Sequence, residues 1–392
     1  MMGSDLFMNK KIKNLLSTLL LTIFISSIGN YATGVQASAI DNISTISTIA
    51  KNTPKYLLGN TSEDWNAVSI INNRPLYDFN NKLIAYSVDL KNKINDEKAY
   101  VIVSVNEEDE PIIEFAIGHF SPYDKVDENS QTCIYDGVLS YYSKQIQAST
   151  TKYYDINKNY ELGDLAAQDL ISSSKNKRYT SLNPIKSKET RNKLMSTNNI
   201  NNADVSNTKA IINNLATAST SKILSVPRYQ WYKGCAPTSA AMVIKYNYSS
   251  SYVSTVSSTT LIAKLATNMY TNSAGSTYTT NLPSGVIATM VAYGVSSHCY
   301  NDTSGSGKAG NTFAEYCSEI NSNKSLEVSL FGNTTPTTAY PSGFGDHSVA
   351  GIGYSTYNGS YEIVNDTSVS DGAIYCNYNS SSFGTPWYTY FH

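Results

Sequence analysis

The sequence has little charge, few histidines and few cysteines. Only 15% of its 392 residues are charged, and the formal net charge is -2. Proteins that bind nucleic acid normally present a basic face, so we predict no nucleic-acid partner. The four histidines and five cysteines include no CxxC or HxxxH spacing. A zinc site needs several such ligands close together, so we predict no metal and no other cofactor.

Long apolar runs are also missing after the first forty residues. No later run approaches the length of about 18 residues that a membrane span requires. The beginning of the chain is different. Lys10, Lys11 and Lys13 form a basic segment, and an apolar segment follows over residues 15–28. Small residues at 35–39 could direct cleavage. We therefore predict a signal peptide at residues 1–39 and a secreted protein, extracellular or associated with the cell surface, without a membrane span in its mature form.

An exported chain could pair its cysteines, but here their number is odd and their density is low. If Cys235 is a free nucleophile, one disulfide such as Cys299 with Cys317 remains possible.

Residues 40–171 are predicted to form an N-terminal domain. The runs 83–90, 99–105 and 111–117 are rich in strand-forming residues and are separated by polar turns, which predicts an antiparallel meander. Residues 136–147 could form a helix. Residues 172–221 are basic and rich in Asn, which predicts a mobile linker. Such a linker is either a passive tether or an activation segment, since exposed basic linkers are preferred sites of proteolysis.

Residues 222–392 are predicted to form a second domain of the α+β class. Helices are expected after Cys235 and over residues 258–269 and 285–293. Strands are expected over residues 327–331, 348–354, 361–364 and 373–378. Helices first and strands afterwards, without βαβ alternation, are typical of an α+β domain.

Cys235 follows Gly234 at the expected start of a helix, and Pro237 suits a first helical turn. The unpaired amides and the dipole of a helix start favour a thiolate, as a cysteine nucleophile requires. The alternative is a buried structural cysteine.

A cysteine nucleophile also needs a base and a group that orients the base. His347 begins an apolar, glycine-punctuated run, whereas His298 lies in a polar loop and is the weaker candidate. A tight Asn358-Gly359 turn should return the chain to the start of that run. Either Asp366 or Asn365 could then orient His347. The amide of Cys235 and the side chain of Gln230 could stabilise an oxyanion.

The sequence around these candidate residues resembles that of papain-fold cysteine peptidases, in particular the family related to the bacteriocin-leader, or double-glycine, peptidases. The resemblance covers roughly residues 222–392 and rests on Gln230, residues 234–242 (GCAPTSAAM), residues 346–354 (DHSVAGIGY) and residues 364–366 (VND). It implies a papain-like domain with a helix bearing Cys235 as nucleophile and a C-terminal antiparallel sheet bearing His347 as base and Asp366 as orienter. Gln230 would complete the oxyanion hole. Ala236 and Thr367 depart from the family's usual Gly and Pro.

The resemblance implies a cysteine endopeptidase that acts on a peptide or protein substrate. Together with the predicted signal peptide and basic linker, it predicts a secreted enzyme made as a zymogen, with its own smaller N-terminal domain as a candidate inhibitor. Two alternatives use the same residues differently, namely a non-hydrolytic binding module and a transpeptidase. The double-glycine specificity is not carried over, because those relatives are usually fused to a transporter and this sequence has neither membrane helices nor a phosphate-binding loop.

Overall fold

The computed structural model describes residues 43–59, 63–148, 150–157, 159–174, 183–196, 220–302, 311–331, 347–368 and 372–392. The described residues from Thr48 to His392 belong to one compact unit. The predicted signal peptide, residues 197–219 of the predicted linker and residues 332–346 before His347 lie outside the described residues. Within the described part, no helix is long and apolar enough to cross a membrane.

The N-terminal part is mainly antiparallel sheet. Its strands are β1 (Val68–Tyr77), β2 (Leu83–Asn92), β3 (Lys98–Ser104), β4 (Ile112–Ile117), β5 (Gln131–Gly137), β6 (Ser140–Gln147), β7 (Thr150–Asp155) and β8 (Tyr160–Glu161). Its helices cover residues 43–58, η2 (Glu63–Asn66), η3 (Pro122–Lys125), α2 (Asp164–Ser174) and α3 (Pro184–Ser196). The predicted meander is confirmed, because β2, β3 and β4 pair antiparallel in chain order.

The helix expected over residues 136–147 is wrong. These residues form the turn and second strand of the β5–β6 hairpin. Gly137 and Leu139 have positive φ angles of 139° and 61°, which a helix does not allow. Tyr141 and Tyr142 are buried in the strand that follows. Aromatic side chains pack well on a half-buried sheet, and this tertiary packing overrides the local sequence pattern.

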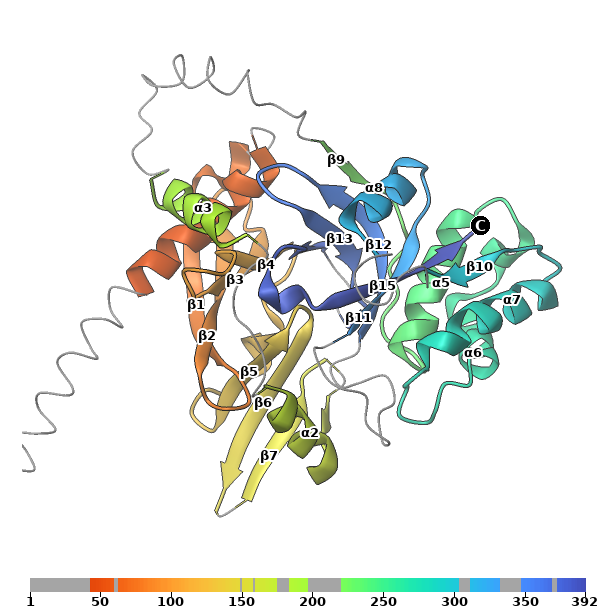
Figure 1. The fold of residues 1–392 in the computed structure, drawn as a ribbon, viewed down its shortest axis with the longest axis horizontal. Coiled ribbons are helices and arrows are strands. Elements are labelled where there is room, and N and C mark those ends of the chain that lie inside the picture. The colour runs from red at the N-terminus through yellow and green to blue at the C-terminus, as the bar shows by residue number, and fades with distance from the viewer. Residues whose placement is uncertain are drawn as a thin grey trace, which may run out of the picture. The chain divides into compact units, whose positions relative to one another are not determined.

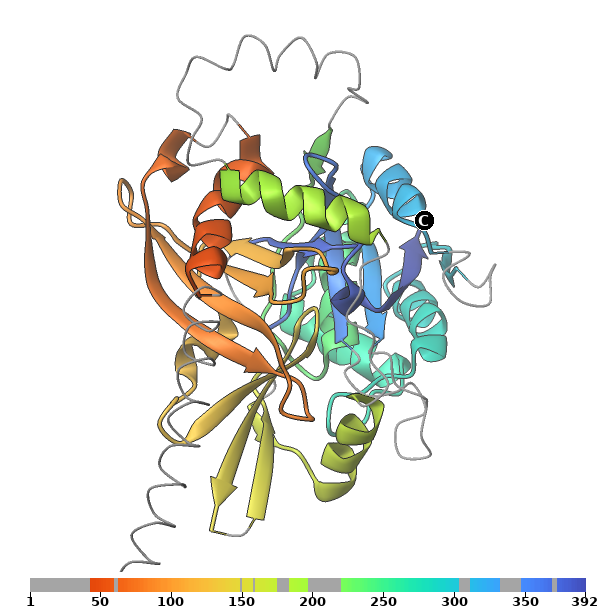
Figure 2. The same ribbon diagram turned by 60° about the vertical axis from the view of Figure 1, so that its left-hand side comes forward.

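The prediction of a mobile linker over residues 172–221 is wrong for α3, which occupies residues 184–196. Pro184 suits the first turn of a helix. The Arg191 guanidinium donates to the carbonyl oxygens of Ser104 (3.1 Å) and Asn106 (2.9 Å). Figure 2 shows α3 lying across the strands of the N-terminal part. The helix also buries three residues in its interface with the rest of the unit: Ser187, Thr190 and Leu194.

The C-terminal part is α+β, as predicted. Its helices are α5 (Cys235–Asn247), η5 (Tyr252–Thr255), α6 (Ser258–Asn268), η6 (Thr279–Asn281), α7 (Leu282–Ala292), α8 (Phe313–Asn321) and η8 (Ser381–Phe383). Its strands are β9 (Ser221–Ile223), β10 (Cys299–Asn301), β11 (Leu326–Phe331), β12 (His347–Ser355), β13 (Tyr361–Asn365), β14 (Ile374–Asn377) and β15 (Thr385–Phe391). The expected helices and strands are present with shifts of a few residues, whereas α8 and β15 were not expected.

The two parts share a single sheet, which is visible in Figure 1 as orange and yellow strands that continue into blue ones. The strand order is β10-β15-β11-β12-β13-β14-β4-β3-β2-β1-β5-β6-β7-β8, and β9 adds to β12. The junction is an antiparallel pairing of β14 with β4, in which Cys376 lies opposite Glu114. Asn377 strengthens it by donating to the carbonyl of Ile112 at 2.9 Å. The two predicted domains are therefore joined by backbone hydrogen bonds as well as by the chain.

Candidate active site

A strained turn presents Cys235 at the first residue of α5. Gly234 has φ 149° and Lys233 has φ 64°, a conformation that few non-glycine residues adopt. A Cβ atom on Gly234 would lie 2.6 Å from the carbonyl oxygen of Gly275, so only glycine fits here. Thr238 locks the turn, because its hydroxyl donates to the Gly234 carbonyl at 2.7 Å and accepts from the Tyr232 amide at 3.1 Å. Cys235 is left half-buried at the helix start.

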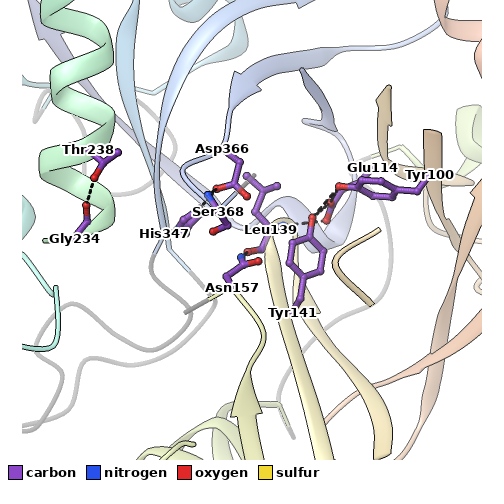
Figure 3. A network of polar contacts seen from close by, with 10 residues as sticks. All are labelled: Tyr100, Glu114, Leu139, Tyr141, Asn157, Gly234, Thr238, His347, Asp366 and Ser368. Carbon is purple, nitrogen blue, oxygen red and sulfur yellow. Dashed lines mark hydrogen bonds and ion pairs between the residues drawn. The ribbon is translucent and has the colours of Figure 1, made fainter. Parts of the chain in front are cut away.

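A hairpin brings His347 and Asp366 together. His347 is the first residue of β12 and is 6% exposed. The predicted Asn358-Gly359 turn joins β12 to β13, and Asp366 directly follows β13. The Nε2 atom of His347 lies 2.6 Å from Oδ1 of Asp366, which also accepts the Ser368 amide at 3.1 Å. Figure 3 shows these contacts beside the first turn of α5, which is marked by Gly234 and Thr238.

Cys235 interacts with the His347 side chain, because it raises the pKa of the imidazole. Nε2 is engaged by Asp366, so Nδ1 is the ring nitrogen that could receive the thiol proton. Burial of His347 disfavours its charged form, but the Asp366 carboxylate and Cys235 outweigh burial and raise the pKa of His347 to about 10. Burial acts against the charge of Asp366 too, but His347 holds its pKa below the usual value. The site thus favours an imidazolium between a carboxylate and a cysteine.

Asn365, the alternative orienter, has other partners. Its Oδ1 accepts from Nε of Arg228 at 2.8 Å, and its Nδ2 donates to the Val226 carbonyl at 3.1 Å. The structure therefore places Asp366, and not Asn365, against His347.

Gln230 lies in the loop that connects β9 to α5. This loop is fixed next to Asp366, because the Trp231 amide donates to the Thr367 carbonyl at 2.7 Å. The Gln230 side chain is exposed and is not hydrogen-bonded to another described residue. The structure thus brings the backbone of this loop to the site, and the oxyanion role of Gln230 stays a prediction.

Residues 223–391 match the model of the Peptidase_C39 like family. They form a Peptidase_C39-like domain. The family indicates a papain-like cysteine peptidase and therefore a peptide or protein substrate. The match covers the C-terminal part of the chain, and the N-terminal part lies outside it. No curated protein and no solved structure matches the chain.

The weaker base candidate, His298, lies at the start of β10 in the C39-like domain. Its ring packs against Tyr300 with the ring centres 5.0 Å apart. Its backbone pairs with that of His392. His298 therefore lies among aromatic residues at the edge of the sheet that β10 forms.

All five cysteines lie in described parts of the chain and none is in a disulfide, so the Cys299–Cys317 bridge is not formed. Burial raises the pKa of Cys133 and of Cys317 to about 12. It also raises the pKa of Cys299 and Cys376 above that of an ordinary thiol. Since the thiolate is the reactive form, these four thiols are poor nucleophiles.

Sequence reasoning missed Glu327, a fully buried carboxyl on β11 of the C39-like domain. The Ser329 hydroxyl donates to its Oε1 at 2.8 Å. Burial raises the pKa of Glu327 to about 7, and Cys235 adds to the elevation, so the two groups lie within electrostatic reach. The sequence signal for Glu327 was an acidic residue inside the apolar run 326–331. A buried carboxyl is rare without a partner, so its presence there indicates a specific polar environment.

Proposed function

We propose that the chain is a secreted cysteine endopeptidase that uses Cys235 as nucleophile, His347 as general acid and base and Asp366 as orienter. One observation carries the proposal. Within a C39-like domain, a half-buried cysteine at a helix start interacts with a buried histidine, and one ring nitrogen of that histidine lies 2.6 Å from a buried carboxylate. This chain of contacts is the arrangement that activates a thiol for acyl transfer.

In the proposed reaction, the Cys235 thiolate attacks the carbonyl carbon of the scissile peptide bond. The oxyanion that forms accepts hydrogen bonds from the Cys235 amide and the Gln230 side chain. The imidazolium of His347 then protonates the leaving amine, and an acyl-enzyme remains. A water molecule loses a proton to His347 and attacks this thioester, which releases the carboxylic acid product and restores the Cys235 thiolate and the His347 imidazolium. Asp366 keeps the His347 ring oriented throughout.

We further propose that the protein is exported as a zymogen and that its linker is cut. Residues 1–39 have the features of a signal peptide, and residues 197–219 are rich in Asn. This stretch lies between α3, which ends at Ser196, and β9, which begins at Ser221. A cut between these two elements would leave both of them intact.

The test compares wild-type protein with Cys235→Ala. Iodoacetamide should alkylate Cys235 selectively, because burial raises the pKa of the other four thiols. Wild type should cut its own linker and a peptide library, and both activities should require reductant, since a free thiol is readily oxidised. Cys235→Ala should do neither. Normal linker processing in Cys235→Ala, together with a wild type that cuts no peptide, would refute the proposal. An added amine that captures the acyl product would instead reveal a transpeptidase.

A further inference from the structure

The turn between β5 and β6 of the N-terminal domain lies behind the Asp366–His347 pair. Leu139, at this turn, is 1% exposed. Figure 3 shows Leu139 pointing toward Asp366, whereas the start of α5 lies on the opposite side of His347. The N-terminal domain therefore approaches the carboxylate end of the candidate triad and not the thiol end.

Hydrogen bonds on both sides hold this turn in place. The Leu139 amide donates to Oε1 of Glu114 at 3.0 Å, and the Leu139 carbonyl accepts from Asn157 at 3.0 Å. The preceding amide, of Val138, donates to the carbonyl of Ser382 in the C39-like domain at 2.9 Å. Leu139 keeps a left-handed φ of 61°, which is unfavourable for leucine and persists only where the surroundings impose it.

Behind Leu139 lies a buried polar cluster centred on Glu114 of β4. Its carboxylate accepts hydrogen bonds from three tyrosine hydroxyls, those of Tyr100 (3.3 Å), Tyr135 (2.5 Å) and Tyr141. The cluster lies within electrostatic range of the candidate site, because the charge of Asp366 acts on Tyr100. The same charge acts on Cys376 of β14.

The strength of the Asp366–His347 interaction depends on the exclusion of water. The Asp366 side chain is fully buried, and its Oδ2 atom has no hydrogen-bond partner among the residues that the structure describes, while Oδ1 contacts His347 and accepts from the Ser368 amide. An ion pair is several-fold stronger in a protein interior than in water. Water that reached Oδ2 would hydrate the carboxylate and weaken its ion pair with His347.

We propose that Leu139 is a positioning residue that seals the Asp366–His347 pair from water, so that the N-terminal domain completes the site of the C39-like domain instead of inhibiting it. This inference rests on the proposed function. It also implies that the zymogen is activated by the cut in the linker and not by release of the N-terminal domain, because β4 and β14 remain paired after the cut.

The test is the pH dependence of Cys235 alkylation by iodoacetamide in full-length Leu139→Gly, measured by mass spectrometry of the labelled peptide. Glycine favours the φ of this turn, so the change removes the side chain without straining the backbone. We expect the alkylation rate at about pH 6 to fall roughly tenfold, the equivalent of one pKa unit. Leu139→Asn tolerates the same φ, adds a polar group, and should act in the same direction. The control is Leu170→Ala, which empties a buried position in another cluster of the N-terminal domain.

The outcomes separate this inference from the proposed function. If wild-type Cys235 reacts no faster at low pH than a free thiol does, the proposed function fails. If wild type is reactive and both Leu139 variants keep its pH profile, or if either variant gains peptidase activity, the positioning role of Leu139 is refuted. A loss of reactivity in Leu170→Ala equal to that in Leu139→Gly would also refute it, because it would show a general effect of stability.

Discussion

Replacement of Asp366 by Asn tests the electrostatics of the site most directly. The pKa of His347 is raised from 6.5 to about 10, against the effect of burial. This elevation corresponds to roughly 5 kcal/mol, at 1.36 kcal/mol for each pKa unit. The Asp366 carboxylate is the main cause of the rise. Without it, burial should dominate and bring the pKa of His347 to 6.5 or below.

The consequence for activity follows from the fraction of imidazolium. At about pH 8, a histidine with a pKa of 6.5 is protonated in only about 3% of molecules. The loss of protonation and of ring orientation together should lower kcat/KM by about 10²- to 10³-fold. The alkaline limb of the pH profile should move down by several pH units. A fluorogenic peptide assay from about pH 5 to 10, with Cys235 alkylation in parallel, measures both effects.

Asn365→Ala is the matched control for Asp366→Asn. The side chain of Asn365 contacts Arg228 and the Val226 carbonyl, and not His347. Its removal should leave the pH profile in place. If Asn365→Ala abolishes activity while Asp366→Asn retains the wild-type profile, the assignment of the orienter is wrong.

Two further predictions concern the turn before Cys235 and a buried carboxyl. Gly234→Ala should lower activity, and it should lower the free energy of unfolding by about 1–3 kcal/mol, because its Cβ would meet the Gly275 carbonyl. Gly163→Ala is the control in thermal unfolding, because its Cβ meets nothing within 4 Å. Burial raises the pKa of Glu362 to about 8, so the folded state binds its proton more tightly and the protein should lose stability as pH rises from about 4.5 to 8. Glu362→Gln should flatten this loss in denaturant titrations, and an unchanged slope would contradict the assignment.

Local sequence patterns predicted the elements whose structure depends on near neighbours. The meander β2–β3–β4 and the Asn358-Gly359 hairpin are formed by residues a short distance apart, and turn residues and alternating side chains encode both. The hairpin is also what carries Asp366 back to His347. The ordered set of Cys235, His347 and Asp366 could therefore be proposed from the amino-acid sequence alone.

Features that depend on distant partners could not be predicted in this way. The β5–β6 hairpin buries its tyrosines around Glu114, which lies on a different strand pair. The helix α3 is held by backbone carbonyls of Ser104 and Asn106, more than eighty residues away. The orientation of Leu139 toward Asp366 and the burial of Glu327 near Cys235 likewise come from tertiary packing. These contacts cannot be predicted from any single stretch of the sequence.

The pairing of β4 with β14 has a consequence for the order of events during synthesis. Asn377 and Ile112 are 265 positions apart, so the ribosome must release a long stretch of chain before they can meet. Contacts between such distant positions form late, because a large loop must close first. A nascent chain that ends before β14 therefore cannot close the shared sheet, and the N-terminal part pairs with the C39-like domain only after β14 has been made.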